Sequence, residues 1–138
     1  MMEEELNRLG FKQVGQFYIT NNDLEYELYS SEYATGTYIF LVDRKVEYVG
    51  ETKRDLKTRM NGYKNPGPTQ MTNQRIKGKL VEEIKRGKIV EIWFIPDSHI
   101  RSLKVILAGE KGRKEVVADA KLLERFIIRV FTPEWNLN

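Results

Sequence analysis

The sequence contains no cysteine and one histidine, His99, among its 138 residues. The absence of cysteine excludes disulfide bonds, zinc sites built on thiolates, and thiol nucleophiles. No apolar run reaches the length that a membrane-spanning helix requires. Residues 1–5 are acidic, whereas a secretory signal begins with basic and then apolar residues. These absences predict a cytoplasmic protein with no membrane attachment.

Length and composition predict one folded domain, residues 1–138. A chain of this length can bury a hydrophobic core without covalent staples. Hydrophobic residues make up 41% of the sequence and charged residues 31%, a balance typical of globular rather than disordered chains. No internal repeat or low-complexity segment is present.

Charge is distributed unevenly along the chain. Residues 1–32 contain seven acidic and two basic residues, whereas residues 53–88 contain eleven basic and three acidic residues. A basic stretch within a folded domain is typical of a surface that contacts a phosphate backbone. A solvated helix face rich in lysine has the same composition, so charge alone leaves both interpretations open.

Apolar periodicity, turn residues and helix caps predict an α+β order of elements. The expected elements are a helix over 3–9, strands over 17–20 and 24–29, a hairpin of strands 38–42 and 46–50, a helix from a cap at Asp55 to about Tyr63, a helix from a cap at Thr72 to Gly87, a strand over 89–95, a peripheral hairpin within 97–117, and a last helix over about 119–130 with Leu123, Ile127 and Val130 facing the core. We expect a small mixed sheet with a central hairpin, flanked by helices.

The central hairpin places two tyrosines together. With a three-residue turn at 43–45, Tyr48 opposes Phe40 and Gly50 opposes Tyr38. The two tyrosines then share one face of the sheet as diagonal neighbours, and the glycine leaves open space opposite a phenol ring. Paired aromatic residues also stabilise hairpins without any catalytic role, so this pattern alone leaves the function open.

Five motifs follow one another in a recognisable order: Gly36-Thr37-Tyr38, Tyr48-Val49-Gly50, Arg59, Glu124 and Asn136. This order resembles the GIY-YIG nuclease superfamily over about residues 35–138, with threonine in place of the middle isoleucine of the first motif. The resemblance implies a GIY-YIG-like nuclease core at 35–138 with an insertion near 97–117. Residues 1–34 then form an N-terminal extension, a short helix and a hairpin.

The resemblance also implies roles for individual residues. Tyr38 or Tyr48 would take a proton from water, with Tyr38 as the favoured base and Tyr48 as its partner, or a phenol would only orient the water. Arg59 would hold the scissile phosphate, and Glu124 would bind Mg²⁺, with Mn²⁺ as a substitute. A free phenol has a pKa near 10, so a nearby cation must lower that value before the phenol can act as a base. The remaining members of the expected site are Tyr63, one helical turn after the arginine, and the supporting residues Gly50, Lys53 and Asn136, the last of which would tie the C-terminus to the site through amide hydrogen bonds.

One departure keeps a second function open. Several relatives carry a lysine three residues after the second tyrosine, where this chain has Glu51, and the nearest lysine is Lys53. The chain is therefore expected to be a metal-dependent DNA endonuclease or, alternatively, a nucleic-acid-binding module of the same fold with little or no catalysis. A third hypothesis is that the chain is a basic domain that docks on an acidic protein.

The expected partner is DNA, contacted by the basic residues Lys57, Arg75, Lys77 and Lys79. The chain is too short to append a separate DNA-binding domain, as homing and repair enzymes of the family often do. A compact restriction-like or phage-borne enzyme is therefore the expected type. A homodimer or a partner protein would supply further specificity.

Overall fold

The computed structural model describes residues 2–101, 103–109, 112–117 and 119–136, and only the backbone of 104–109 and 112–117. Its middle layer is a five-stranded sheet in the order β2-β1-β5-β3-β4. The strands are β1 (Lys12–Thr20), β2 (Asp23–Leu28), β3 (Gly36–Val42), β4 (Lys45–Thr52) and β5 (Val90–Pro96). The expected α+β class with flanking helices is confirmed, but the hairpin β3–β4, expected to be central, forms one edge of the sheet with β4 outermost. The sheet is not the mixed one expected, because β5 runs antiparallel to both of its neighbours and every other pairing in the sheet is also antiparallel.

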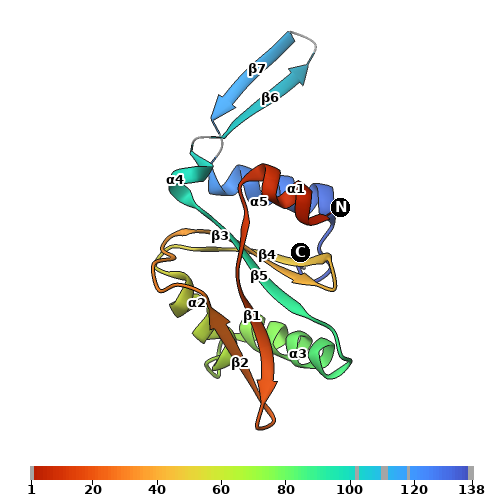
Figure 1. Ribbon diagram of the computed structural model, residues 1–138. Helices are drawn as coiled ribbons and strands as arrows, with labels where there is room; N and C mark the ends of the chain where they lie inside the picture. Colours follow the sequence, from red (N-terminus) through yellow and green to blue (C-terminus); the bar gives the residue numbers. More distant parts are fainter. Residues whose placement is uncertain (1, 102, 110–111, 118, 137–138) are drawn as a thin grey trace.

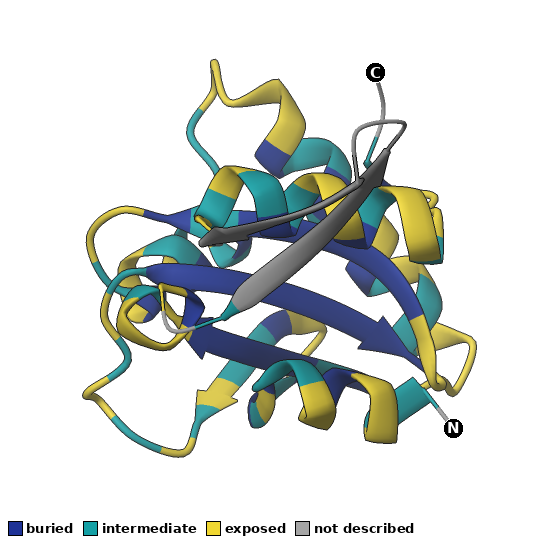
Figure 2. Cartoon of the chain, turned by 90° about the horizontal axis from the view of Figure 1, so that it is seen from above, coloured by how far each residue is buried: buried dark blue, intermediate teal, exposed yellow. Residues whose placement is uncertain are grey.

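Helices cover both faces of the sheet (Figure 1). The helices are α1 (Met2–Leu9), α2 (Leu56–Lys64), α3 (Met71–Lys85), α4 (Asp97–Ile100) and α5 (Ala120–Phe131). One core lies between the sheet and α2 and α3, and a second core lies between the sheet and α1 and α5. Because β3 is buried along its whole length (Figure 2), both of its faces are packed.

Alternation along β3 sends neighbouring side chains into different cores. Tyr38 and Phe40 belong to the core under α2 and α3, whereas Ile39 and Leu41 belong to the core under α1 and α5. The tyrosine face of the hairpin is therefore fixed toward α2.

The turn between β3 and β4 differs from the expected turn at 43–45. It has two central residues, Asp43 and Arg44, with φ of 44° and 71°, as a tight hairpin turn requires. A β-bulge at Glu47 then adds one residue to β4. The two differences cancel, so the expected pairs are present: Phe40 with Tyr48, and Tyr38 with Gly50.

The expected cap at Asp55 is confirmed, and Asp119 forms a second cap that was not predicted from the sequence. Asp55 precedes α2 and its Oδ1 accepts a hydrogen bond from the Thr58 backbone N at 2.7 Å. Asp119 precedes α5 and its Oδ1 accepts from the Leu122 backbone N at 2.7 Å. Each carboxylate satisfies an amide that the helix itself leaves unpaired.

Two other local expectations are wrong. The helix expected to begin at Thr72 begins at Met71, and Gln70 occupies the cap position, with its side chain accepting instead from the Gly67 backbone N at 2.8 Å. Val130, expected in the core, is 52% exposed, although the helical period puts it on the same face as Leu123; it lies in the last turn of α5.

The segment 97–117 contains α4 and a peripheral hairpin, as expected. Strands β6 (Lys104–Gly109) and β7 (Gly112–Val117) pair with each other and form a sheet of their own, which projects from the α4 and α5 end in Figure 1. The expected turn at 109–112 falls partly on residues 110–111, which lie outside the described residues. At the N-terminus, β1 pairs with β5, so residues 1–34 supply two strands of the main sheet. In the described part of the chain, no helix is long and apolar enough to span a bilayer.

Removing the α5 cap should loosen the helix that carries Glu124. Asp119→Ala is expected to lower the free energy of unfolding by about 1 kcal/mol, because the Leu122 amide loses its acceptor. Urea denaturation followed by circular dichroism measures the change. Asp119→Asn retains an acceptor and should lose only a few tenths of that value, so an equal loss in both variants would contradict a capping role.

Candidate active site

Three side chains form a hydrogen-bonded cluster on the α2 side of the sheet. The Tyr38 hydroxyl lies 2.5 Å from the Tyr63 hydroxyl and accepts a hydrogen bond from Arg59 Nε at 2.9 Å. The guanidinium carbon of Arg59 lies 4.9 Å from the centre of the Tyr63 ring, within cation–π range. Arg59 and Tyr63 are four residues apart on α2, so they share a helix face and both reach the strand.

Tyr48 completes the aromatic group on this face. Its ring centre lies 6.3 Å from that of Tyr38 and 6.2 Å from that of Tyr63. Gly50 is required beside it, because a Cβ at this position would lie 2.5 Å from the Tyr38 hydroxyl oxygen. The three phenols and the arginine named from the sequence therefore occur together.

Burial controls the ionisation of two of these phenols. Tyr38 and Tyr63 have no exposed surface. Burial raises the pKa of both hydroxyls above the ordinary tyrosine value, and the positive charge of Arg59 acts in the opposite direction. Both hydroxyls are therefore protonated at neutral pH, and a proton-accepting role for Tyr38 requires more positive charge than Arg59 supplies.

An open cleft of about 360 Å³ adjoins the cluster. Its walls come from the end of β4, the following loop, α2 and the start of α3: Glu51, Thr52, Lys53, Arg54, Asp55, Thr58, Arg59, Gly62, Gln70 and Asn73. Lys53 and Arg54 are exposed and give the mouth of the cleft positive charge. Lys53 was named from the sequence, whereas Arg54 was passed over within a long basic stretch and Asn73 carried no signal.

Glu124 approaches from the other side of the sheet. Its neighbour Leu123 is buried in the core between the sheet and α5, and Glu124 itself is half-buried. Its carboxyl lies within hydrogen-bond reach of the Glu51 carboxyl, which also borders the cleft. Burial, and then the charge of Glu51, raises the pKa of Glu124, while Lys121 opposes the shift. Glu124 is therefore next to Glu51, which lines the cleft, but Glu124 itself is not among the lining residues. From the sequence, Glu51 was identified only as a departure from a motif.

The C-terminal segment is held against the edge of β4. The Asn136 side chain donates to the Val49 carbonyl and accepts from the Val49 amide, both at 2.9 Å. The Trp135 backbone N donates to the Glu47 carbonyl at 2.9 Å. The amide hydrogen bonds expected of Asn136 are therefore present, one residue away from Gly50.

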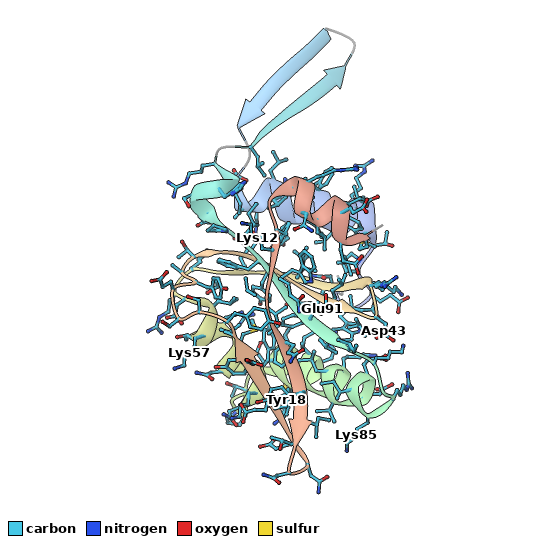
Figure 3. The ribbon with its side chains drawn as sticks, in the orientation of Figure 1. Lys12, Tyr18, Asp43, Lys57, Lys85 and Glu91 are labelled. Atoms are coloured by element: carbon cyan, nitrogen blue, oxygen red, sulfur yellow. The ribbon has the colours of Figure 1, made fainter. Side chains whose placement is uncertain are left out.

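Two of the four basic residues named for DNA contact have partners within the chain and two are exposed. Arg75 donates to the Trp135 carbonyl at 3.0 Å, and Lys77 lies 3.8 Å from Asp23 in the β1–β2 turn. Lys57 is exposed on α2 (Figure 3), and Lys79 is exposed on α3. Arg75 and Lys77 therefore have partners within the chain, and DNA contact by these four residues stays a prediction.

Comparisons with known proteins give a fold and no family. No protein-family model and no curated protein sequence matches the chain. The structure is similar to that of a mutant of EndoII from bacteriophage T4, with a TM-score of 0.67 and 20% identity over 99% of this chain and 98% of that chain. It is also similar, more distantly, to the restriction endonuclease HPY188I in complex with product DNA, with a TM-score of 0.48 and 15% identity over 93% of this chain and 79% of that chain. The first similarity supports the α+β fold over the whole chain.

The buried phenols should resist ionisation. Because the pKa of Tyr38 and Tyr63 is raised in the folded state, the stability that their protonated hydroxyls contribute is complete below the unfolded value of about 10 and is lost as pH rises through the folded values. At about pH 11 the native protein should therefore form fewer phenolates than the urea-unfolded protein, as measured by near-ultraviolet absorbance. Tyr63→Phe should reduce this difference, and identical phenolate signals in the native and unfolded proteins would contradict the burial argument.

Gly50 should tolerate no side chain. Gly50→Ala is expected to destabilise the protein by about 1–3 kcal/mol, because the added methyl group meets the buried Tyr38 ring. Gly78→Ala is the matched control: a Cβ there meets nothing within 4 Å, so the change should be neutral or stabilising in a helix. Thermal unfolding of both variants measures the difference, and equal stabilities would refute the steric account.

Proposed function

We propose that this chain is a metal-dependent endonuclease that hydrolyses DNA phosphodiester bonds. The observation that supports this function most directly is the Tyr38–Arg59–Tyr63 cluster beside a cleft with a cationic mouth. The cleft wall also contains Glu51, next to Glu124. The fold, shared with an endonuclease of bacteriophage T4, agrees with this function.

Substrate binding would depend on the positive charge at the cleft. Lys53 and Arg54 would attract the sugar-phosphate backbone through long-range electrostatics. Arg59 would contact the scissile phosphate with a planar guanidinium whose orientation the Tyr38 hydroxyl already fixes. This contact strengthens as negative charge accumulates on the phosphate in the transition state.

The oxygen ligands at the edge of β4 suit a hard divalent cation. Glu124 and Glu51 together offer two carboxyl groups, and no group of three or more His, Cys, Asp or Glu side chains suited to a metal occurs among the residues that the structure describes. Mg²⁺ typically takes one or two carboxylates and completes its shell with water and substrate phosphate. When bound, Mg²⁺ supplies counter-charge to the phosphate and lowers the pKa of water; Mn²⁺ is the expected substitute.

Tyr38 would accept the proton of the attacking water. Water then adds to phosphorus and its proton moves to the Tyr38 oxygen. The bond to the 3′ oxygen breaks, and that oxygen takes up a proton from solvent water to leave as a hydroxyl. Tyr38 must be a phenolate for this step, so positive charge at the cleft has to offset the burial that raises its pKa. Tyr48 lies beside Tyr38 as its partner, and Tyr63 fixes the hydroxyl by a hydrogen bond.

We propose that the protein acts in the cytoplasm, as a restriction enzyme or a phage nuclease. Cleavage of both strands of a duplex would require either two copies of the chain related by symmetry or a partner protein.

Plasmid nicking in Mg²⁺ tests this function. The wild-type protein should nick supercoiled plasmid, and Glu124→Gln and Arg59→Ala should each reduce the rate by about 100-fold or more, because each removes a charge aimed at the transition state. Glu82→Gln and Arg86→Ala are matched controls at an exposed ion pair on the far end of α3 and should retain activity.

The outcomes separate the competing functions. Equal cleavage by Glu124→Gln, Arg59→Ala and the wild type would remove the site assignment. Salt-sensitive DNA retention without cleavage, across varied substrates and metals, would instead favour the nucleic-acid-binding module. Absence of salt-sensitive retention would favour docking on an acidic protein.

A further inference from the structure

Two polar residues face each other across the β3–β4 ladder, on the side away from the phenols. Thr37 of β3 pairs directly with Glu51 of β4. Directly opposed residues of an antiparallel pair project to the same face, with Cβ atoms about 4.5–5.5 Å apart. Ile39 and Val49, two residues along each strand, belong to the core under α5, so Thr37 and Glu51 project to the α5 side as well.

The Thr37 hydroxyl lacks a partner among the described residues. The residue has no exposed surface, and its Oγ1 makes no hydrogen bond to any of the described residues. A buried hydroxyl without a partner is destabilising, whereas valine would fill the same space with apolar atoms. The hydroxyl at this position is therefore free to bond a partner from outside the described residues.

The negative charges of the Glu51 and Glu124 carboxyl groups are only weakly balanced by nearby positive charge. Lys121, one helical turn before Glu124 on α5, lies against Glu51. The same face of the helix therefore brings Glu124 next to Glu51, whose side chain is only 21% exposed. The Lys121 Nζ lies 4.0 Å from Glu51 Oε1, and its side chain is 69% exposed, so this ion pair is long and solvated. A cation between the two carboxyl groups would offset their repulsion more fully.

We propose that Thr37, Glu51 and Glu124 form one oxygen-lined site for a divalent cation at the edge of β4. Glu51 is a second carboxylate ligand beside Glu124, and the Thr37 hydroxyl hydrogen-bonds a water of the ion's shell. This inference rests on the proposed function, because it concerns the same cation, and it goes further by assigning that cation a protein-built site that forms without DNA.

Titration of the full chain with Mn²⁺ alone tests the site, by isothermal calorimetry without DNA. Glu124→Gln and Glu51→Gln should each weaken Mn²⁺ binding about tenfold or more. Thr37→Val should weaken it by about twofold to tenfold, the value of one hydrogen bond. Glu82→Gln, at an exposed position on α3, should leave the affinity unchanged.

Unfolding temperatures, measured with and without Mn²⁺, distinguish a variant that folds poorly from one that has lost a metal ligand. Without metal, Thr37→Val should unfold at the same temperature as the wild type or higher, because the unpaired buried hydroxyl is gone. Addition of Mn²⁺ should then raise the unfolding temperature of the wild type by more than that of Thr37→Val or Glu51→Gln.

The possible results distinguish this inference from the proposed function. Wild-type Mn²⁺ affinity in Glu51→Gln, with affinity lost in Glu124→Gln, overturns the inference. So does a wild type that nicks plasmid in Mg²⁺ yet binds no Mn²⁺ without DNA; both results spare the nuclease function. Mn²⁺ binding that depends on all three residues, in a protein that cuts no plasmid, supports the cation site and removes the nuclease function.

Discussion

Side-chain alternation along the β3–β4 ladder decides which functional groups can meet. Tyr38, Tyr48 and Gly50 face α2, whereas Thr37 and Glu51 face α5. The two faces receive helices from different parts of the chain, and each helix brings its own chemistry: guanidinium and phenol from α2, carboxylate from α5. A shift of one residue in the pairing would exchange the two faces and separate every one of these groups. The candidate site therefore depends first on the register of the β3–β4 pair, and only then on the identity of each side chain.

The phenol cluster links stability to the candidate chemistry. Tyr38 and Tyr63 are completely buried, and their hydroxyls satisfy each other and receive the Arg59 Nε–H. Loss of one member would leave a buried polar atom unpaired, which is costlier than the loss of the hydrogen bond itself. The same burial orients the guanidinium at the cleft, since its partner cannot rotate within a packed core. Rigid placement of the phosphate-binding group is thus a by-product of core packing.

Local features of the sequence were predictable and long-range ones were not. Asp55 was recognisable as a cap because a cap acts within one turn of its own helix. The bulge at Glu47 has no sequence signal, and the Tyr38–Gly50 pairing was right only because the bulge offset a shorter turn. The direction of β5 in the sheet depends on contacts between distant segments. The motif resemblance named the phenols, Arg59 and Glu124, whereas the proximity of Glu51 to Glu124 arises only when α5 packs on the sheet.

The Asn136 side chain pairs with β4 in the way that the main chain of a neighbouring strand would. Its amide offers one donor and one acceptor to Val49. The exposed border of β4 is thereby closed to sheet extension along this stretch, so another polypeptide cannot add itself there by strand pairing. Edge-to-edge association through the main sheet is left to β2, whose outer rim is the opposite margin.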